Sequence, residues 1–122
     1  MMAVTILVVE DNELSMKLLH HLLKPRGYNI LQTGEGMEAL KLARQHKPDL
    51  ILMDIRLPDV SGLEVTKWIK ESDALKAIPI IAVTAFAMKG DEERFRERGF
   101  DAYVAKPIFL ADFLKTIQHC LC

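Results

Sequence analysis

The stretch LILMD, residues 50–54, decides the fold class of this chain. Its first four residues are apolar without any polar alternation, which indicates a strand covered on both faces rather than one with a face in water. Strands of this kind belong to parallel sheets whose crossover helices cover both sides. The run ends in a carboxylate, Asp54. We therefore expect a parallel α/β fold with a polar group at the end of this strand.

The rest of the chain alternates short apolar runs with longer segments of helical period. The predicted strands cover residues 5–9, 28–32, 50–53, 80–83 and 102–105, and the last predicted helix runs from about residue 109 to the end. No segment resembles a linker, a repeat or a low-complexity tail. The pattern predicts five strands and five helices in one doubly wound α/β domain, residues 1–122.

Composition and charge exclude several classes of protein. The 122 residues carry 16 Lys and Arg against 17 Asp and Glu, a formal net charge of -1, without the basic excess of a nucleic-acid binder. The longest uncharged run, residues 77–88, contains Pro79 and is shorter than the ~20 residues of a membrane span. The N-terminus lacks the basic region of a signal peptide, and Cys120 and Cys122 are expected to be free thiols. We expect a cytoplasmic protein that contacts no nucleic acid and inserts into no membrane.

Chemically active side chains gather at the predicted strand ends. Glu10 and Asp11 follow the first strand, Asp54 the third, Thr84 the fourth and Lys106 the fifth. Ligands of open α/β sheets bind outside the carboxyl ends of the strands. Several carboxylates at one edge are costly unless a cation binds or a pKa rises, and Mg²⁺ takes such oxygen ligands together with a phosphoryl group. The pattern indicates a phosphoryl site with a carboxylate acceptor.

Other interpretations of these residues stay open. Taken singly, the acids fit helix caps or turns, Thr84 fits a strand-end hydroxyl, and Lys106 fits a solvated loop residue. An FMN-binding flavodoxin-like protein would need hydroxyl and amide groups after the first strand to bind the phosphate. Glu10 stands there instead and would repel it. A phosphatase that forms an aspartyl phosphate would need an acid where Arg56 stands. Flavin absorbance or sustained turnover would favour one of these rivals.

Four segments together carry a family resemblance: ILVVEDN at residues 6–12, LILMDIRLP at 50–58 with Gly62, VTA at 83–85 and YVAKP at 103–107. In order and spacing they resemble the receiver domain of two-component response regulators, the CheY-like family, along essentially the whole chain. The resemblance implies the flavodoxin-like strand order 2-1-3-4-5. It also implies a cis peptide bond before Pro107.

The resemblance implies that Asp54 accepts a phosphoryl group from a sensor histidine kinase or a phosphotransfer protein. Mg²⁺ would be held by Asp11, Asp54 and the backbone carbonyl of Arg56, with Glu10 holding a metal-bound water. The protein would then be a phosphoacceptor that supports its own phosphorylation and slow dephosphorylation, rather than a turnover enzyme.

The resemblance also assigns a switch. Lys106 would pair with Asp54 before phosphorylation and with a phosphoryl oxygen afterwards. Thr84 would move to hydrogen-bond that oxygen, and Tyr103 would turn inward behind it. Arg56 and Phe86 stand where shorter or uncharged residues are frequent in the family, so the resemblance leaves the lifetime of the phosphoryl group open.

Three further segments narrow the subgroup: DNEL at residues 11–14 with MKL at 16–18, GLEVTKW at 62–68 and FAMKGDEER at 86–94. They are similar to single-domain receivers that regulate cell division and polarity. This likeness implies a cytoplasmic regulator without an output domain, acting by protein contact in a phosphorelay of the cell cycle. A role in another pathway and an origin in a hybrid kinase are the alternatives. We expect a monomer; dimerisation on phosphorylation and recruitment to membrane-bound kinases at the cell pole stay open.

The first predicted helix carries more leucine than one core face requires. Leu14, Leu18 and Leu22 form one stripe, while a second stripe contains Leu19. We expect Leu14 and Leu18, together with Ile108, to dock the helical bundle of a partner. The alternative is that all of these side chains belong to the core or are scattered over the surface.

Overall fold

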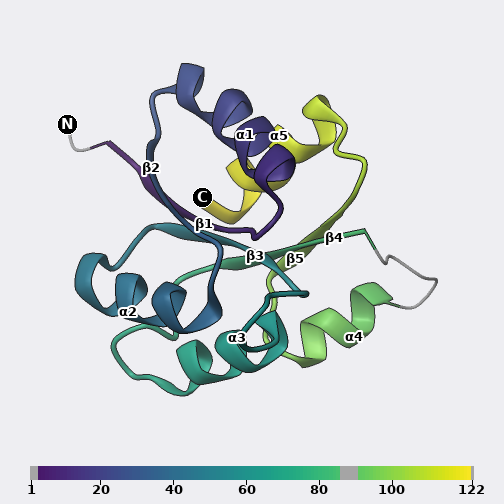
Figure 1. Cartoon of the computed structure of the whole chain (residues 1–122). Coiled ribbons are helices and arrows are strands. Elements are labelled where there is room, and N and C mark those ends of the chain that lie inside the picture. The colour runs from purple at the N-terminus through teal and green to yellow at the C-terminus, as the bar shows by residue number, and fades with distance from the viewer. Residues whose placement is uncertain (1–2, 86–90, 122) are drawn as a thin grey trace.

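All five predicted strands are present and pair in one parallel sheet (Figure 1). The computed structural model describes residues 3–85 and 91–121. The order β2-β1-β3-β4-β5 confirms the order that the family resemblance implies. The strands are β1 (Thr5–Val9), β2 (Asn29–Thr33), β3 (Leu50–Asp54), β4 (Ile80–Thr84) and β5 (Ala102–Ala105). The central strands β3 and β4 are buried along their whole length, as their unbroken apolar runs predict.

The described helices form two layers around the sheet. α1 and α5 cover one face, and α2, α3 and α4 cover the other (Figure 1). The helices are α1 (Glu13–Leu23), α2 (Gly36–His46), α3 (Gly62–Glu71), α4 (Asp91–Glu97) and α5 (Leu110–Leu121). A short 3-10 helix, Lys24–Arg26, follows α1 and was not predicted from the sequence. It contains Pro25, which cannot continue an α-helix, and it ends at Gly27 with a φ of 84°.

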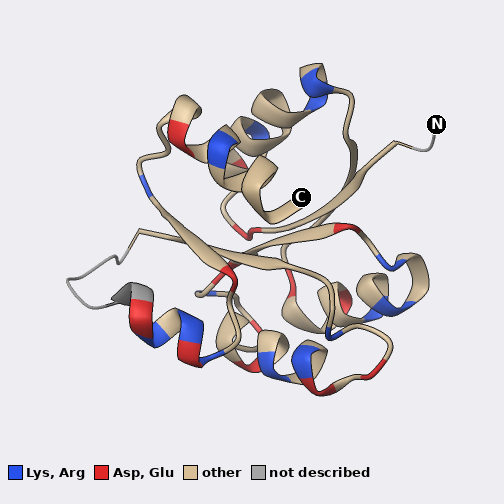
Figure 2. Cartoon of the chain, turned by 180° about the vertical axis from the view of Figure 1, so that it is seen from behind, with Lys and Arg blue, Asp and Glu red and all other residues tan. Residues whose placement is uncertain are grey.

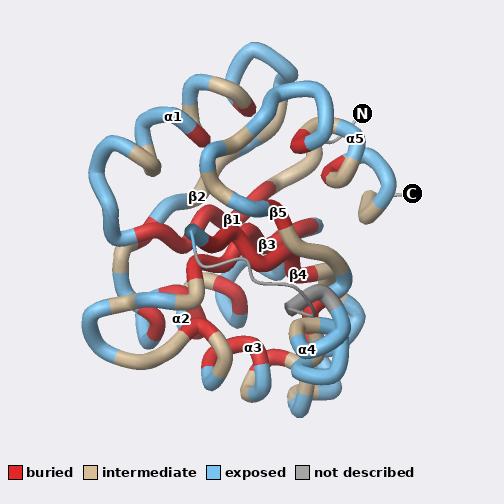
Figure 3. Tube along the Cα trace, turned by 90° about the vertical axis from the view of Figure 1, so that its right-hand side faces the viewer, coloured by how far each residue is buried: buried red, intermediate tan, exposed pale blue. Residues whose placement is uncertain are grey.

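The core is divided between the two faces because successive strand residues point to opposite sides of the sheet. Leu7 and Val9 of β1 belong to the cluster under α2 and α3, whereas Ile6 and Val8 belong to the cluster under α1 and α5. Phe113 of α5 is fully buried in the second cluster. Figure 3 shows the buried residues concentrated in the sheet and on the inner faces of the helices. A core of this kind holds the strand ends rigidly in place.

The strands carry almost no charge. Among the five strands as described, Asp54 is the one Asp, Glu, Lys, Arg or His residue. Figure 2 shows Lys, Arg, Asp and Glu distributed over helices and loops, with both signs present. A charged side chain inside a sheet calls for a specific reason, because removing it from water is unfavourable. No helix among the described residues is long and apolar enough to cross a membrane.

Strands β2, β3 and β4 each end one residue later than predicted, and the extra residues of β3 and β4 belong to the predicted site. Asp54 is the last residue of β3 and aligns with Val83 of β4. Thr84 is the last residue of β4 and aligns with Ala105 of β5. The sequence pattern placed these polar residues just outside the strands because it followed apolar side chains, whereas backbone pairing continues through them. The sheet therefore fixes the backbones of both residues.

Thr66 provides a test of core packing. Its side chain is fully buried in α3, and its hydroxyl finds no hydrogen-bond partner within the described residues. Thr66→Val keeps the shape and removes a desolvated polar group, so the free energy of unfolding should rise by about 1 kcal/mol in urea denaturation. Thr66→Ser is the control: it keeps the hydroxyl, loses a methyl group and should be destabilising. A less stable valine variant would show that the hydroxyl has a partner, such as a buried water.

Candidate functional site

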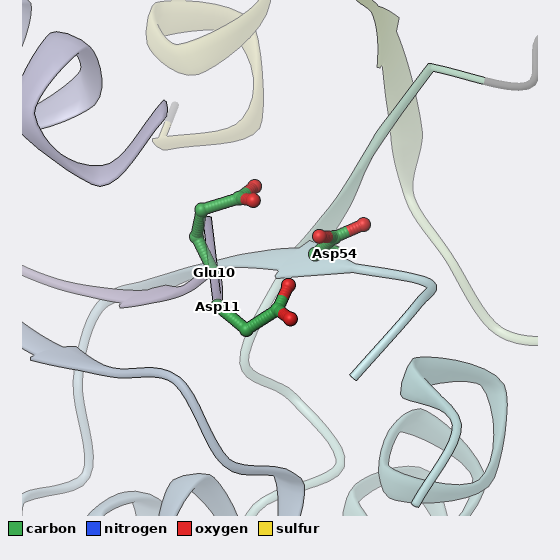
Figure 4. Close-up of side chains that lie close together, drawn as sticks. All are labelled: Glu10, Asp11 and Asp54. Carbon is green, nitrogen blue, oxygen red and sulfur yellow. The ribbon is translucent and has the colours of Figure 1, made fainter. Parts of the chain in front are cut away.

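Three carboxylates meet at the carboxyl ends of β1 and β3. Glu10 and Asp11 directly follow β1, and Asp54 ends β3, which pairs with β1 in parallel. One carboxylate oxygen from each residue lies within 4.8 Å of the others. Figure 4 shows the three side chains side by side beyond the sheet edge. The structure therefore brings together three residues that are 44 positions apart at the widest, from Glu10 to Asp54.

The turn after β1 is held by backbone contacts and by Asn12. The N–H of Glu10 donates to the Thr33 carbonyl at 3.0 Å, which ties the turn to β2. Asn12 caps α1: its side chain accepts a hydrogen bond from the Ser15 N–H at 2.9 Å. Of residues 10–12, any of which could cap the first helix by sequence, Asn12 provides the cap, while Glu10 Oε1 accepts from the Asn12 N–H at 3.2 Å.

The turn after β3 is tight against the site. A side chain at Gly62 would overlap the backbone carbonyl oxygen of Asp54. The Gly62 N–H donates to the Ile55 carbonyl at 2.9 Å, and Ser61 caps α3 by accepting from the Leu63 N–H at 3.2 Å. The N–H of Arg56 donates to Asp54 Oδ1 at 3.3 Å. The backbone of Arg56 therefore lies next to Asp54, as its predicted role requires.

Asp54 is buried and electrostatically perturbed. Its exposed fraction is 8 %. Burial, and then the charge and hydrogen bond of Glu10, raise the pKa of Asp54 to about 6, whereas Lys106 and the Arg56 N–H act in the opposite direction. The like charges that raise this pKa are the arrangement that a divalent cation relieves. The donor set consists of hard oxygen atoms, so it fits a cation such as Mg²⁺.

Lys106 does not pair with Asp54 in this structure, so the prediction for the unphosphorylated state was wrong. Its Nζ donates to Glu10 Oε2 at 2.8 Å and approaches Ser15 Oγ at 3.5 Å. The Glu10 side chain is only 1 % exposed, and a carboxylate so buried needs a direct counter-charge. Lys106 nevertheless lies close enough to Asp54 to lower the pKa of that carboxyl. The ammonium group is therefore at the site, with a different acid as its partner.

Thr84 and Tyr103 lie on neighbouring strands. Thr84 is buried at the end of β4, and its carbonyl accepts from the Lys106 N–H at 2.8 Å. Tyr103 of β5 is half-buried and packs against Phe95 of α4 with ring centroids 5.7 Å apart. The peptide bond between Lys106 and Pro107 is cis. The movements assigned to Thr84 and Tyr103 stay predictions.

A cleft opens at the strand ends, and its lining includes residues beyond those predicted from the sequence. The cleft is lined by residues predicted for the site, namely Glu10, Asp11, Asp54, Arg56 and Lys106, and also by Asn12, Ser15 and Ala85. Ser15 lies on the first turn of α1, which begins at this edge. The signal that could have identified it is its position one helical turn beyond Asp11, on a helix starting at the site.

The predicted partner surface on α1 is partly exposed. Leu14 is 77 % and Leu18 44 % exposed, whereas Leu22 is half-buried against the core. Ile108 is also half-buried against the cluster under α1 and α5. Phe109, which no sequence pattern identified as part of this surface, follows Ile108 and is 69 % exposed. The first stripe therefore divides into two exposed leucines and one core residue.

Several predictions concern residues at the margins of the structure. Cys120 is a half-buried free thiol. Two predicted features lie outside the described residues: residues 86–90 of the FAMKGDEER segment, which begins at Phe86, and Cys122.

The comparisons with known proteins agree with this site. A family model described as "Response regulator receiver domain" matches residues 6–118. The chain is 60 % identical over 117 residues to the polar-differentiation response regulator DivK of Brucella anthropi, covering 96 % of this chain and 95 % of that protein. It is 58 % identical to DivK of Brucella ovis over 120 residues, covering 98 % of each. These matches favour the receiver interpretation over the flavin-binding and phosphatase alternatives.

Two solved structures share the fold over 98 % of each chain. A response regulator from Chloroflexus aurantiacus superposes with a TM-score of 0.93 at 26 % identity. The receiver domain of a sensor histidine kinase from Pseudomonas aeruginosa superposes with a TM-score of 0.90 at 33 % identity, and that structure has a magnesium ion coordinated in its active-site cleft. The chain belongs to the family of response regulator receiver domains.

Proposed function

We propose that this receiver stores a signal as a phosphoryl group on Asp54. The observation that carries the proposal is the position of Asp54, the buried acid of the sheet, with carboxylate oxygens of Glu10 and Asp11 within 4.8 Å. In the transfer step, an Asp54 carboxylate oxygen attacks the phosphorus of a phosphohistidine. A P–O bond forms, the P–N bond breaks, and the imidazole leaves with a proton. The product is a mixed anhydride on Asp54.

The residues around Asp54 suit a bound Mg²⁺. Asp11 and Asp54 would ligate it directly, the Arg56 backbone carbonyl would add a third protein oxygen, and Glu10 would hold a metal-bound water. When bound, Mg²⁺ neutralises the carboxylates and the transferring phosphoryl oxygens. The magnesium-containing Pseudomonas aeruginosa neighbour supports this choice of cation.

Lys106 and Thr84 would stabilise the product. After transfer, the phosphoryl group offers new acceptor oxygens and negative charge, which favour an ammonium and a hydroxyl. Lys106 would exchange Glu10 for a phosphoryl oxygen, and Thr84 would donate its hydroxyl to another. Tyr103 would follow Thr84 inward, which changes the surface next to α4. The protein would thus act as a phosphoacceptor switch without sustained turnover.

The output of the switch is proposed to be protein contact. The DivK relatives are named polar-differentiation response regulators, and the chain covers 95–98 % of their length. We extend this role to the present chain: a single-domain regulator in a phosphorelay of cell division, working in the cytoplasm with histidine kinases or phosphotransfer proteins, and using no nucleic acid as a partner. Recruitment to kinases at the cell pole belongs to the same proposal, as does a monomer before phosphorylation.

Leu18 tests the partner surface. Leu18→Glu places a charge on a side chain that is 44 % exposed and next to Leu14 on α1. A docking helix bundle would have to bury that charge, so phosphotransfer from the cognate kinase should slow about tenfold or more. The melting temperature should stay nearly unchanged. Met37→Glu on α2, which is 52 % exposed, is the control. An unchanged rate of phosphotransfer in the Leu18 variant would show that Leu18 is not part of the docking surface.

Acetyl phosphate tests the proposed chemistry without a kinase. With Mg²⁺ present, the purified protein should incorporate one acid-labile phosphoryl group per chain and release acetate. EDTA should suppress the labelling because the carboxylates then repel the incoming phosphate. Continuous release of inorganic phosphate at many turnovers per minute would instead favour a phosphatase.

A further inference from the structure

One carboxylate outside the acidic cluster joins the loop after β3 to the N-terminus of α2 beside the site. Asp59, in the loop between β3 and α3, accepts hydrogen bonds from the N–H groups of Gly36 at 2.8 Å and Met37 at 3.0 Å. Glu35, which stands at the N-cap of α2, makes no side-chain capping bond. We propose that Asp59 is a positioning residue for the metal site. It fixes the distance between the loop that contains Arg56 and the turn between β2 and α2, which packs against Asp11.

The first loop carries the proposed backbone ligand. Asp54 and Gly62 are in close contact at its base, and the Gly62 N–H donates to the Ile55 carbonyl at 2.9 Å. Asp59 fixes the outer part of the same loop to α2 through both of its carboxylate oxygens. Arg56 lies between these two anchors. Release of the outer anchor would therefore let the Arg56 carbonyl drift from the position that a cation requires.

On its other side, the N-terminus of α2 connects to Asp11 through the turn that precedes it. The turn between β2 and α2 lies between the Asp59 loop and the acidic turn. A Cβ atom on Gly36 would lie 2.5 Å from Val60 Cγ1, and one on Gly34 would lie 3.3 Å from the Asp11 Cα. Gly34 thus allows the turn to approach the backbone of Asp11, and Gly36 leaves room for the side chain of Val60 on the other side of the turn. The carboxylate of Asp59 tightens this stack because it binds the helix end that follows Gly34.

The charge of Asp59 suits this role. Hydrogen bonds from the N–H groups of Met37 and Gly36 lower the pKa of Asp59, so the carboxylate is ionised at neutral pH. A negative charge at a helix N-terminus is also favourable because the first N–H groups carry partial positive charge. Asp59 itself lies outside the three-carboxylate cluster. Its effect on a cation would be exerted through the loop after β3 and through the N-terminus of α2, which it joins.

The experiment measures Mg²⁺ binding, by isothermal titration calorimetry, and thermal unfolding in the same variants of the whole chain. Asp59→Ala should raise the dissociation constant for Mg²⁺ about tenfold, the scale seen when groups that orient metal ligands are removed. Asp59→Asn keeps the shape and one acceptor oxygen and should recover part of the affinity. It also carries the test if the alanine variant does not fold.

Asp49→Ala is the matched control. Asp49 also caps a backbone group, since its Oδ2 accepts from the Thr5 N–H at 2.8 Å, but Thr5 begins β1 at the sheet edge opposite the site. This variant should lower the melting temperature without changing Mg²⁺ affinity. If Asp59→Ala likewise lowers the melting temperature and leaves Mg²⁺ affinity unchanged, Asp59 is only a helix cap and the inference is wrong. The inference rests on the proposed magnesium site, and a wild-type protein that binds no Mg²⁺ would overturn that proposal instead.

Discussion

Asp54→Asn is expected to reduce phosphate incorporation from acetyl phosphate at least a hundredfold. The amide has no nucleophilic carboxylate oxygen and cannot form the mixed anhydride. It keeps the shape of the side chain and one oxygen that can accept from the Arg56 N–H, so the fold should persist. Incorporation is measured in the presence of Mg²⁺ with radiolabelled acetyl phosphate.

Asp49→Asn is the matched control for this loss. Asp49 directly precedes β3, whereas Asp54 ends it, so the two aspartates lie at opposite ends of one strand. The control variant should be labelled as well as the wild type. Labelling of Asp54→Asn at the wild-type level would show that another residue accepts the phosphoryl group.

Asp54→Asn should also stabilise the metal-free protein at neutral pH. The pKa of Asp54 is raised from 3.8 to about 6 in the folded state. Between these values the folded chain binds the proton more tightly than the unfolded chain, so wild-type stability falls as pH rises. The neutral amide avoids this loss. A difference of roughly two pKa units corresponds to at most about 3 kcal/mol in the free energy of unfolding.

The pH profile of that difference is the measurement. In urea unfolding with EDTA, the free energy of unfolding of the variant should rise relative to that of the wild type from about pH 4 to pH 6. The difference should stay constant above pH 7. Saturating Mg²⁺ should stabilise the wild type and narrow the gap, since a ligand of the folded state shifts unfolding by mass action. A stability difference that does not change with pH would contradict the buried, like-charged environment of Asp54.

The sheet was predictable from local pattern, whereas its strand order was not. Buried parallel strands appear in sequence as unbroken apolar runs, so residues 50–53 and 80–83 identified β3 and β4 nearly to the residue. Strand order depends on tertiary pairing and came from the family resemblance. The 3-10 helix after α1 was not predicted because a proline such as Pro25 is equally typical of a helix that simply ends.

The members of the site were also predictable, but not all of their contacts. Parallel strands place Glu10, Asp11 and Asp54 at one edge whatever their side-chain conformations. The partner of Lys106 depends on how deeply Glu10 is buried, which no spacing reveals. The bond between Asp59 and Gly36 joins a loop to the N-terminus of α2 across 23 positions of sequence and follows no periodic pattern. Contacts of this kind are visible only in three dimensions.

The most direct test of the central claim is to locate the phosphoryl group on the wild-type protein. After reaction with acetyl phosphate and Mg²⁺, borohydride reduces an aspartyl phosphate to homoserine, which peptide mass spectrometry identifies by position. We predict that the modification appears at Asp54 and is absent when EDTA replaces Mg²⁺. A modification at Asp11 or at a histidine, or labelling that is indifferent to EDTA, would contradict the proposed site.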